Sequence, residues 1–393
     1  MGVQFHIEEV VDELSKRNFL ELPVRLYENE PNWIRPLDSD IEDVFDPRKN
    51  KMFQRGTCCR WILKNSNGHT VGRVAAFIDN KTRDIDDQPT GGMGFFECID
   101  DKNAACILFD LCSEWLKNQG IQAMDGPINF GERHQWWGLL VDGFHRPLYN
   151  MPYSLPYYQN LFELYGFKTF FKQYTYKTLF STDSLSEIIA WKAKRIERNP
   201  DYSVVCFDKK NRDKFLRDFV HIYNEAWVST IPGVDFMTEE QANETFDSLS
   251  SILHERLLWF AYYKDEPIGF FIMTPDMNEV LNGLDGQFGL KGKLKFLHYK
   301  YFKKNKNAVG LIFGVVPAFQ SKGIDAAMIY QFSKEGFNPK FPFETLEMNW
   351  IGDFNPRMMH MMDHIGASIY KTHITYRKLF DESKVFERSP IIG

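Results

Sequence analysis

A short polar segment, Gln320 to Ile324, has the residue types that could hold a pyrophosphate. It follows a continuous apolar, β-branched run from Val309 to Val316, which predicts a buried strand. Over residues 325–332 the pattern becomes helical. At the start of such a helix, free backbone N–H groups and the positive end of the helix dipole attract an anion, and Lys322 adds a charge. The sequence therefore predicts an anion-binding loop between a strand and a helix.

Histidines mark two further places where chemistry could occur. His134 lies within residues 125–138, a segment rich in Gly, Trp and polar side chains that indicates a shaped binding surface. It could act as a base if it faces the second half of the chain, whereas a lone loop histidine is more often a surface residue. His360 and His364 have the i, i+4 spacing of a helical metal-binding pair, but no third ligand stands out. We therefore predict no metal.

These residues belong to a chain that repeats itself at an offset of 200 residues. The segments 156–180 and 356–380 align without a gap. Each predicts a helix that starts near a proline, ends at a glycine and precedes an alternating strand. Further upstream, residues 61–77 and 259–273 both predict a strand, a polar turn and a second strand. Such long-period similarity predicts two copies of one α/β unit, each built around a mixed sheet.

The length agrees with this repeat, because 393 residues fit two domains of ordinary size. We expect the boundary near 181–200, where polar residues and Arg-Asn-Pro flank a charged helical segment. The first domain would then cover residues 1–185 and the second residues 200–393.

The second half resembles the GNAT superfamily of acyl-CoA-dependent N-acyltransferases. The resemblance covers about residues 203–380 and rests on four elements in the family's order. These are a hairpin with Ile268-Gly269, the strand, loop and helix from Val315 to Ile324, a strand over 344–351, and Asn355 eleven residues before Gly366. The loop is similar to the family's [RQ]-x-x-G-x-[GA] motif. The first half resembles the same fold more faintly, so the whole is similar to bacterial two-domain N-acyltransferases and to aminoacyl transferases that build peptidoglycan cross-bridges.

The resemblance implies that a primary amine directly attacks the thioester of acyl-CoA. Backbone N–H groups at Val315 and Val316 would stabilise the developing oxyanion. Two positions depart from the family's pattern: Asp325 stands where the family has Gly or Ala, and Met362 stands where a tyrosine often serves as the general acid. The residues implied to contact the co-substrate are Val315, Val316, Gln320, Ser321, Lys322, Gly323, Ile324, Ala326 and Asn355.

The first half departs further from that pattern. Its equivalent of the loop, residues 94–101, places acidic residues where phosphates would lie and lacks a Gln-x-Lys-Gly pattern. Those acids would cap the following helix instead. We therefore expect the first unit to have no phosphate loop and to form one wall of the acceptor site.

An amine with a pKa near 10 arrives protonated, so the implied reaction needs a base. Glu347 is the first candidate, because it lies in the predicted strand over 344–351 and shares a face with Asn349 by alternation. The alternative role for Glu347 is an ion pair with a neighbouring lysine or arginine. Asp325 and His134 are the other candidates for a catalytic role.

Composition excludes several classes of protein. The formal net charge of −6 and the pI of about 6.0 argue against nucleic-acid binding. No apolar run approaches the roughly 20 residues that span a bilayer, and the N-terminus lacks a secretory signal pattern. Six cysteines form neither a C-x-x-C site nor an evident disulfide framework. We therefore expect a cytoplasmic protein.

Residues 286–307 contrast with this acidic composition, since they contain seven lysines and no acidic residue. Leu290, Leu294, Leu297 and Tyr301 recur at helical spacing. This pattern fits an amphipathic helix attracted to an anionic lipid surface, or alternatively a solvated helix that covers a domain edge. Contact with a membrane would favour a lipid or long-chain amine as the acceptor, of the sphingoid-base type.

The sequence thus predicts an α/β protein of two tandem GNAT-like units, of which the second binds acyl-CoA. The predicted activity is acyl transfer from acyl-CoA to a primary amine held between the units. One alternative is an aminoacyl or peptidyl transferase with a donor other than CoA. The other is a retired transferase that only binds a ligand or partner.

Overall fold

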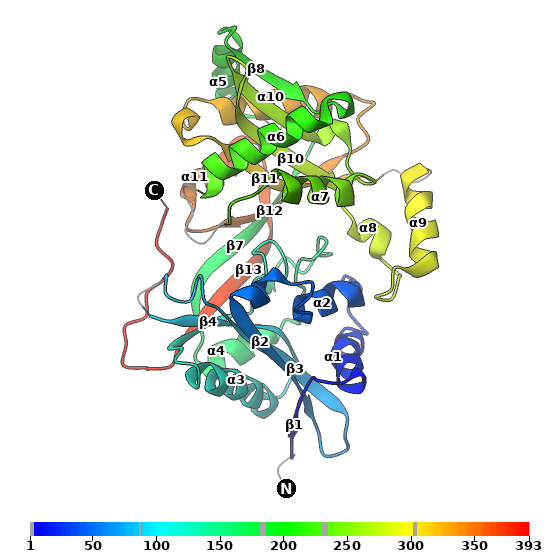
Figure 1. The fold of residues 1–393 in the computed structure, drawn as a ribbon, viewed down its shortest axis with the longest axis vertical. Coiled ribbons are helices and arrows are strands. Elements are labelled where there is room, and N and C mark those ends of the chain that lie inside the picture. Colours follow the sequence, from blue (N-terminus) through cyan, green and yellow to red (C-terminus); the bar gives the residue numbers. More distant parts are fainter. Residues whose placement is uncertain (1–3, 86–87, 181–184, 229–234, 302–304, 393) are drawn as a thin grey trace.

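A computed structural model of the protein describes residues 4–85, 88–180, 185–228, 235–301 and 305–392. Within these ranges, thirteen strands form one mixed sheet, and helices lie on both of its faces (Figure 1). Residues 181–184 of the predicted boundary and residues 302–304 of the predicted amphipathic segment lie outside the described residues.

The first half contributes strands β1 to β7 to this sheet. The strands are β1 (His6–Glu9), β2 (Gly56–Lys64), β3 (Thr70–Asp79), β4 (Thr90–Cys98), β5 (Ala123–Gly126), β6 (Leu139–Asp142) and β7 (Lys168–Leu179). The helices are α1 (Glu13–Leu26), α2 (Asp38–Phe45), the short η1 (Lys51–Gln54), α3 (Lys102–Lys117) and α4 (Tyr158–Tyr165).

The second half contributes strands β8 to β13. The strands are β8 (Tyr202–Cys206), β9 (Leu258–Tyr263), β10 (Glu266–Pro275), β11 (Asn307–Val315), β12 (Thr345–Gly352) and β13 (Ser368–Leu379). The helices are α5 (Glu187–Glu197), α6 (Arg212–Tyr223), α7 (Glu239–Leu249), α8 (Asn278–Leu281), α9 (Gly289–Tyr301), α10 (Ile324–Gly336) and α11 (Pro356–His364). Short turns of helix are η2 (Lys209–Asn211), η3 (Asn224–Val228), η4 (Glu255–Leu257) and η5 (Pro317–Phe319).

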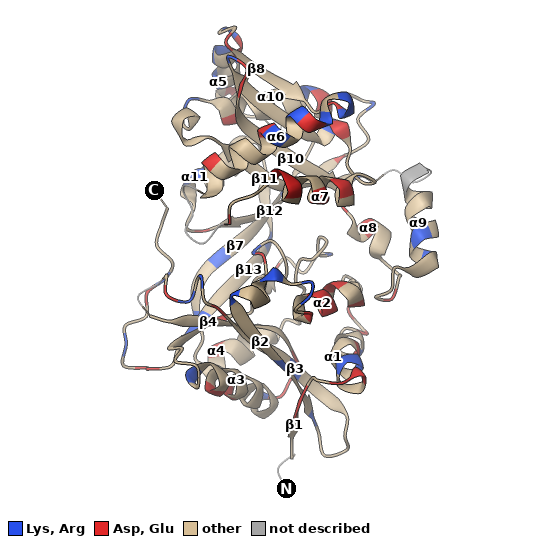
Figure 2. Cartoon of the chain, viewed as in Figure 1, with Lys and Arg blue, Asp and Glu red and all other residues tan. Residues whose placement is uncertain are grey.

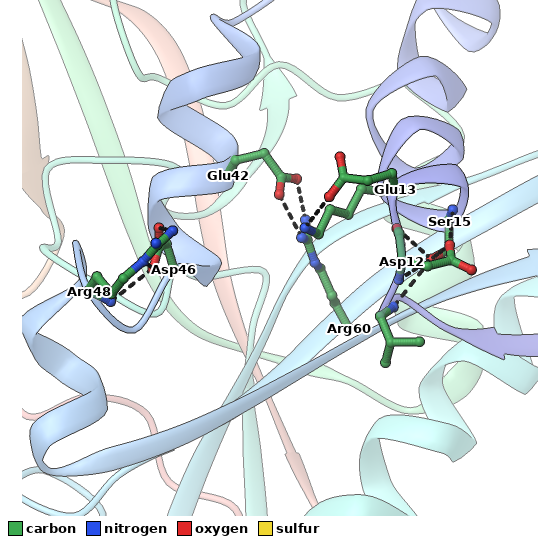
Figure 3. A network of polar contacts seen from close by, with 9 residues as sticks. Asp12, Glu13, Ser15, Glu42, Asp46, Arg48 and Arg60 are labelled. Atoms are coloured by element: carbon green, nitrogen blue, oxygen red, sulfur yellow. Dashed lines mark hydrogen bonds and ion pairs between the residues drawn. The ribbon is translucent and has the colours of Figure 1, made fainter.

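Local sequence signals account for where several helices begin and end. Helix α1 begins at a capping box, in which the Asp12 carboxylate accepts the Ser15 N–H at 2.8 Å (Figure 3). Helix α7 begins at the same kind of motif, at Thr238. Helices α4 and α11 end just before Gly166 and Gly366, whose φ angles of 98° and 65° lie in the left-handed region that favours glycine. These boundaries follow from short-range chemistry.

The last strand of each half lies in the sheet of the other half. The strand order is β1-β2-β3-β4-β5-β13-β7-β12-β11-β10-β9-β8, and β6 also pairs with β13. Strand β13 pairs with β5 of the first half, β7 pairs with β12 of the second half, and the two exchanged strands pair with each other. The repeat detected in the sequence is therefore joined by strand exchange into a single sheet, which the sequence did not predict.

The exchange extends to the hydrophobic cores. Tyr376 of β13 is fully buried in the core of the first half, with its ring 5.6 Å from that of Phe162 on α4. Its counterpart in the repeat, Tyr176 of β7, is buried in the core of the second half. Neither half completes its own core with its own last strand.

Helices α1, α2 and α6 cover one face of the sheet. Arg73 of β3 donates to the Phe19 carbonyl of α1 at 2.7 Å, and Phe270 of β10 packs on Phe219 of α6 with 5.0 Å between ring centroids. Helices α3, α4 and α10 cover the opposite face. We refer to these two surfaces of the sheet as the α1–α6 face and the α3–α10 face.

Candidate active site

The sheet opens between β11 and β12. These parallel strands pair over four residue pairs that end at Gly310 and Met348. Leu311 is then an extra residue opposite β10, a β-bulge that bends the strand. Beyond the bulge, β11 continues to Val315 and β12 to Gly352 without pairing to each other. The second half therefore has a gap between two strands at their carboxyl ends.

The end of β11 directs one backbone donor into this gap. The Val316 N–H donates to the Ile268 carbonyl of β10 at 2.9 Å, so it points away from the gap. Successive N–H groups of a strand point to opposite sides, so the Val315 N–H is directed toward β12. The Val315 carbonyl accepts a hydrogen bond from Gln320 Nε2 at 3.1 Å. Of the two residues expected to hold an oxyanion, the backbone of Val315 has the suitable direction.

The predicted anion-binding loop lies directly after β11. It passes through η5 to Ser321 and Gly323, whose φ angles are 60° and 95°. Gly323 precedes α10 and provides no side-chain cap, so no side chain occupies the first N–H groups of that helix. Arg195 of α5 donates to the Lys322 carbonyl at 3.0 Å and helps to fix the loop. An uncapped helix N-terminus beside an exposed lysine can bind an anion.

The other residues predicted to contact the co-substrate have different surroundings. Ile324 and Ala326 are buried, so their backbone N–H groups are the parts that can serve an anion. Asp325 is half-buried in the first turn of α10, where a negative charge suits the helix dipole. Asn355 caps α11, with its Oδ1 accepting the Met358 N–H at 3.2 Å. The structure thus gathers the loop residues around the start of α10 and gives Asn355 a separate capping role.

The corresponding gap in the first half is filled by the chain itself. The parallel pairing of β4 with β5 ends at Gly92 and Asp125. The chain then crosses β4, with the Ile128 N–H donating to the Met93 carbonyl at 2.8 Å. A Cβ atom on Gly94 would lie 1.8 Å from the Ile128 carbonyl oxygen, so this segment sits in close contact with β4.

Helix α3, the counterpart of α10, also has its own cap. The Asp101 carboxylate accepts the Ala104 N–H at 2.9 Å and so occupies the position that an anion would need. Both features agree with a first unit that lacks a phosphate loop.

Glu347 lies in a buried ion-paired cluster that spans the exchanged strands. Its carboxylate is 3.0 Å from Nζ of Lys177 on β7 and 2.7 Å from Nζ of Lys371 on β13, and it also accepts from Asn307 at 3.3 Å. Burial lowers the pKa of Lys371 and raises the pKa of the nearby Asp276 carboxyl to about 6. Both oxygens of Glu347 are thus held by lysines, which is the ion-pair role weighed against its role as a base.

A water-sized cavity of about 10 Å³, here called the seam cavity, lies where the halves meet. Gln173, Asn349 and His373 reach it from three adjacent strands, and Arg133, His134 and Trp137 of the first half also line it. His373 is 3% exposed, and its Nε2 lies 3.2 Å from the Pro152 carbonyl oxygen. Burial lowers the pKa of His373 to about 4, so the ring is neutral at pH 7, with the proton on Nε2 and Nδ1 unprotonated.

His134 lies at the rim of the seam cavity, on the segment of the first half that reaches the second half. Trp350 Nε1 donates to the Arg133 carbonyl at 3.0 Å, which ties this segment to β12. The His134 ring is exposed at the rim, and desolvation lowers its pKa. His134 therefore meets the condition set in the sequence analysis for a role as a base, that it faces the second half, and the role itself stays a prediction.

Sequence reasoning did not select Gln173, Lys371 or His373. Each lies in the repeated strands, where buried polar side chains occur at every second position, as at Lys371, His373 and Thr375. Polar residues at every second position of a buried strand indicate that one of its faces carries a polar network. That signal was present in the sequence.

No group of three or more His, Cys, Asp or Glu residues that could hold a metal ion occurs within the described ranges. His360 lies 3.9 Å from Asp363 in the exposed part of α11. Among the helices of the described residues, none is long and apolar enough to cross a membrane.

Comparison with known proteins places this geometry in a known fold. No protein-family model matches the chain. In sequence, the chain is 28% identical over 371 residues to a bacterial ceramide synthase from Caulobacter vibrioides, covering 92% of this chain and 94% of that protein. It is 26% identical over 364 residues to protein YghO from Escherichia coli, covering 92% of each.

Two solved structures match almost end to end. One is a tandem GNAT protein from the clavulanic acid biosynthesis pathway, with a TM-score of 0.52 and 9% identity over 96% of this chain and 98% of that one. The chain described here therefore has the tandem GNAT fold. The second is a GCN5-related N-acetyltransferase from Sphaerobacter thermophilus, with a TM-score of 0.51 and 10% identity over 95% of each chain. The predicted fold class, a mixed α/β protein of two tandem GNAT-like units, is confirmed.

Proposed function

We propose that this tandem GNAT protein is an N-acyltransferase that moves an acyl group from acyl-CoA to a primary amine. The observation that carries the proposal is the uncapped N-terminus of α10 beside the gap between β11 and β12. The names of its relatives, a ceramide synthase and N-acetyltransferases, support the same reaction class. A long-chain or lipid amine is the proposed acceptor.

In this mechanism the second half binds the donor. The first N–H groups of α10 and the exposed Lys322 hold the pyrophosphate, and the thioester lies in the gap beside Val315. The amine nitrogen attacks the thioester carbon, and the Val315 N–H stabilises the negative charge that forms on oxygen. The protonated amine gives one proton to a base before the attack; afterwards the C–S bond breaks, the thiolate leaves, and the nitrogen gives up a second proton, which the thiolate or water takes up.

The proton acceptor lies, in this proposal, on the α1–α6 face. Glu347 and His134 reach that face, whereas Asp325 lies at the donor loop, where it sets the charge at the helix start. Two lysines already hold the two carboxylate oxygens of Glu347, at 3.0 and 2.7 Å, so neither oxygen is free to meet an incoming amine. His134 is exposed at the rim of the seam cavity, and desolvation, which lowers its pKa, keeps the ring neutral at pH 7 and so able to accept a proton. We therefore favour His134 as the base and Glu347 as a structural group.

The test is thermal stability against CoA, acetyl-CoA and palmitoyl-CoA, comparing wild type with Gly323→Trp. A ligand at 100 times its Kd adds about 2.7 kcal/mol to the free energy of unfolding. We expect a thioester to raise the Tm of the wild type and to leave Gly323→Trp unchanged, because the indole covers the helix N-terminus.

Gly68→Trp is the matched control. Gly68 also has a positive φ, of 78°, in an exposed turn of the first half with nothing within 4 Å of its Cβ position. It introduces the same side chain and similar backbone strain away from the loop, so it should keep the thioester response. A wild type that responds to no thioester would contradict the proposal and would favour a different donor or a protein that only binds a ligand.

Contact with an anionic membrane through α9 is a further part of the proposal. Leu290, Leu294 and Leu297 are 74%, 61% and 46% exposed, and their spacing places them on one side of the helix. Lys291 and Lys293 flank this row, and Figures 1 and 2 show α9, with its basic residues, at the edge of the molecule. Exposed leucines bordered by lysines are typical of a helix that lies in a lipid interface.

On the cytoplasmic side of a membrane thiols stay reduced, which agrees with six free cysteines.

Replacing Leu290, Leu294 and Leu297 together with serine should weaken binding to phosphatidylglycerol vesicles about a hundredfold or more. Because each leucine is only partly exposed, its transfer out of water contributes about 1 kcal/mol, so the three together contribute about 3 kcal/mol. Co-sedimentation at low salt measures the effect. The control replaces Leu14, Leu164 and Leu179, which are 65%, 52% and 63% exposed on other elements. Equal binding by the two triple variants would argue against α9 as the membrane contact.

A further inference from the structure

The first half contains a cavity of about 90 Å³ that the proposed reaction does not use. It offers roughly six water-sized positions, enough for part of an alkyl chain. Its walls are mainly apolar and aromatic, and they include Leu20, Trp33, Ile41, Phe95, Trp136 and Met151. We call it the chain cavity.

The floor of the chain cavity is a neutralised ion pair. Arg73 lies 3.4 Å from Glu97, and Glu97 also accepts the hydroxyl groups of Tyr27 and Tyr158, both at 2.8 Å. All four side chains are buried. Among the described residues, Nε of Arg73 has no hydrogen-bond partner within this buried network.

The chain cavity and the seam cavity lie on the same face of the sheet. Residues directly opposite one another share a face, and this relation runs from Arg73 through the β3–β4, β4–β5 and β5–β13 pairs to His373. Met151 and Pro152 line both cavities. A molecule that reaches Asn349 from the α1–α6 face therefore has the chain cavity next to it.

The more exposed end of the chain cavity lies beside the start of α9. Arg35 and Asp38 line that end, and the Asp38 N–H donates to the carbonyl of Gly286 at 2.8 Å. Leu37 packs with Leu284 in a small cluster just before α9. The opening thus adjoins the helix whose leucines face outward.

The helices that form the cavity wall are held in place independently of any ligand. Arg60 of β2 pairs with both carboxylate oxygens of Glu42 on α2, at 2.6 and 2.8 Å (Figure 3). The Arg60 guanidinium also lies 4.2 Å from the centre of the Phe45 ring. Arg73 anchors α1 through the Phe19 carbonyl. A preformed wall needs little reorganisation to bind an apolar group.

We infer that the chain cavity binds the apolar chain of the acceptor amine, with the nitrogen toward the seam cavity and the far end of the chain leaving beside α9. The ligand class is a primary amine with an alkyl chain, and the inference rests on the proposed N-acyltransferase activity for its choice of an amine. In the proposed mechanism acyl-CoA binds at the start of α10, which covers the α3–α10 face. The acyl chain of the donor and the alkyl chain of the amine therefore do not compete for the chain cavity.

The first test measures direct binding of butylamine and dodecylamine by calorimetry, without turnover. Wild type should bind dodecylamine at least tenfold more tightly. Leu20→Trp fills the cavity from the half-buried side of α1 and should remove most of that preference. Leu14→Trp, on the exposed side of the same helix, should retain it. A preference that survives Leu20→Trp, or none in wild type, would overturn the inference.

The second test does not depend on the folding of a cavity-filling variant. Dodecylamine brominated at mid-chain should quench the fluorescence of Trp33 and Trp136, which both line the cavity, so the double variant Trp33→Phe, Trp136→Phe should reduce quenching severalfold. Trp191→Phe, at a 63% exposed position on α5, should not. Equal quenching in both variants would place the chain elsewhere, on the leucines of α9 for instance. Chain-dependent amine binding without any thioester response would leave this site standing and refute the acyl-CoA proposal alone.

Discussion

Substitution of Tyr376 by alanine is expected to lower the free energy of unfolding by about 3–5 kcal/mol, the usual range for a buried aromatic side chain. Tyr376 is fully buried, packs on Phe162, and donates its hydroxyl to Glu163 at 3.0 Å. All these contacts are to the first half, although Tyr376 lies in the last strand of the chain. Hydrogen exchange should therefore increase first in β3, β4 and β5 of the first half. Chemical denaturation gives the size of the loss and exchange gives its location.

The repeat supplies the matched variant for this experiment. Tyr176 is the counterpart of Tyr376 in the sequence repeat, 200 positions earlier, and it is 3% exposed in the core of the second half. Tyr176→Ala should increase exchange first in β9, β10 and β11. If hydrogen exchange instead became faster first in the half of the sequence that contains the substituted tyrosine, the result would contradict the exchange of strands β7 and β13.

Replacing Glu347 with alanine is expected to cost about 3–5 kcal/mol of stability, because it leaves a buried charge without its partner. The Lys371 side chain is 1% exposed and has Glu347 at 2.7 Å, whereas Lys177 is 27% exposed and can turn to water. Burial already lowers the pKa of Lys371. When the pKa of a lysine is lower in the folded state than in the unfolded state, folding is penalised at every pH at which the folded lysine is charged. This penalty on the free energy of unfolding disappears as the pH rises toward about 10.4, the pKa of the unfolded lysine. The loss in Glu347→Ala should therefore shrink as the pH is raised.

The double variant Glu347→Leu with Lys371→Met is the control for this interpretation. Replacement of both charges by apolar side chains of similar size should recover most of the stability at pH 7. A loss below about 1 kcal/mol in the single variant would show that Lys371 finds another partner. Lost activity in Glu347→Ala therefore says something about proton transfer only when the variant is shown to be folded under assay conditions.

The sequence predicted those parts of the site that depend on neighbours along the chain. The strand, the glycine with a positive φ and the start of α10 are set by residues 309–332, and the capping box at Thr238 is equally local. The difference between the two halves at the start of α3 and α10 is also local. Asp101 caps α3 with its side chain, whereas Gly323 at the same place before α10 has no side chain to do so. Short-range chemistry decides each of these features.

The strand exchange could not be predicted in the same way. The strands β7 and β13 come from matching segments, so each fits either half by its alternation of polar and apolar residues. The partners of Glu347 and the residues that face His373 follow from that pairing, and they were missed together with it. The row of leucines on α9 was visible, but its outward direction depends on how α8 and α9 pack.

The exchanged strands also set the time at which the protein can finish folding during synthesis. A ribosome adds roughly 5–20 residues per second, so about 10–40 seconds separate the appearance of β7 from that of β13. Throughout that interval β5 lacks β13, its partner in the finished sheet, and the core around Phe162 lacks Tyr376. Unpaired strand edges are sites where chains aggregate. The nascent first half therefore cannot complete its sheet or its core until β13 emerges.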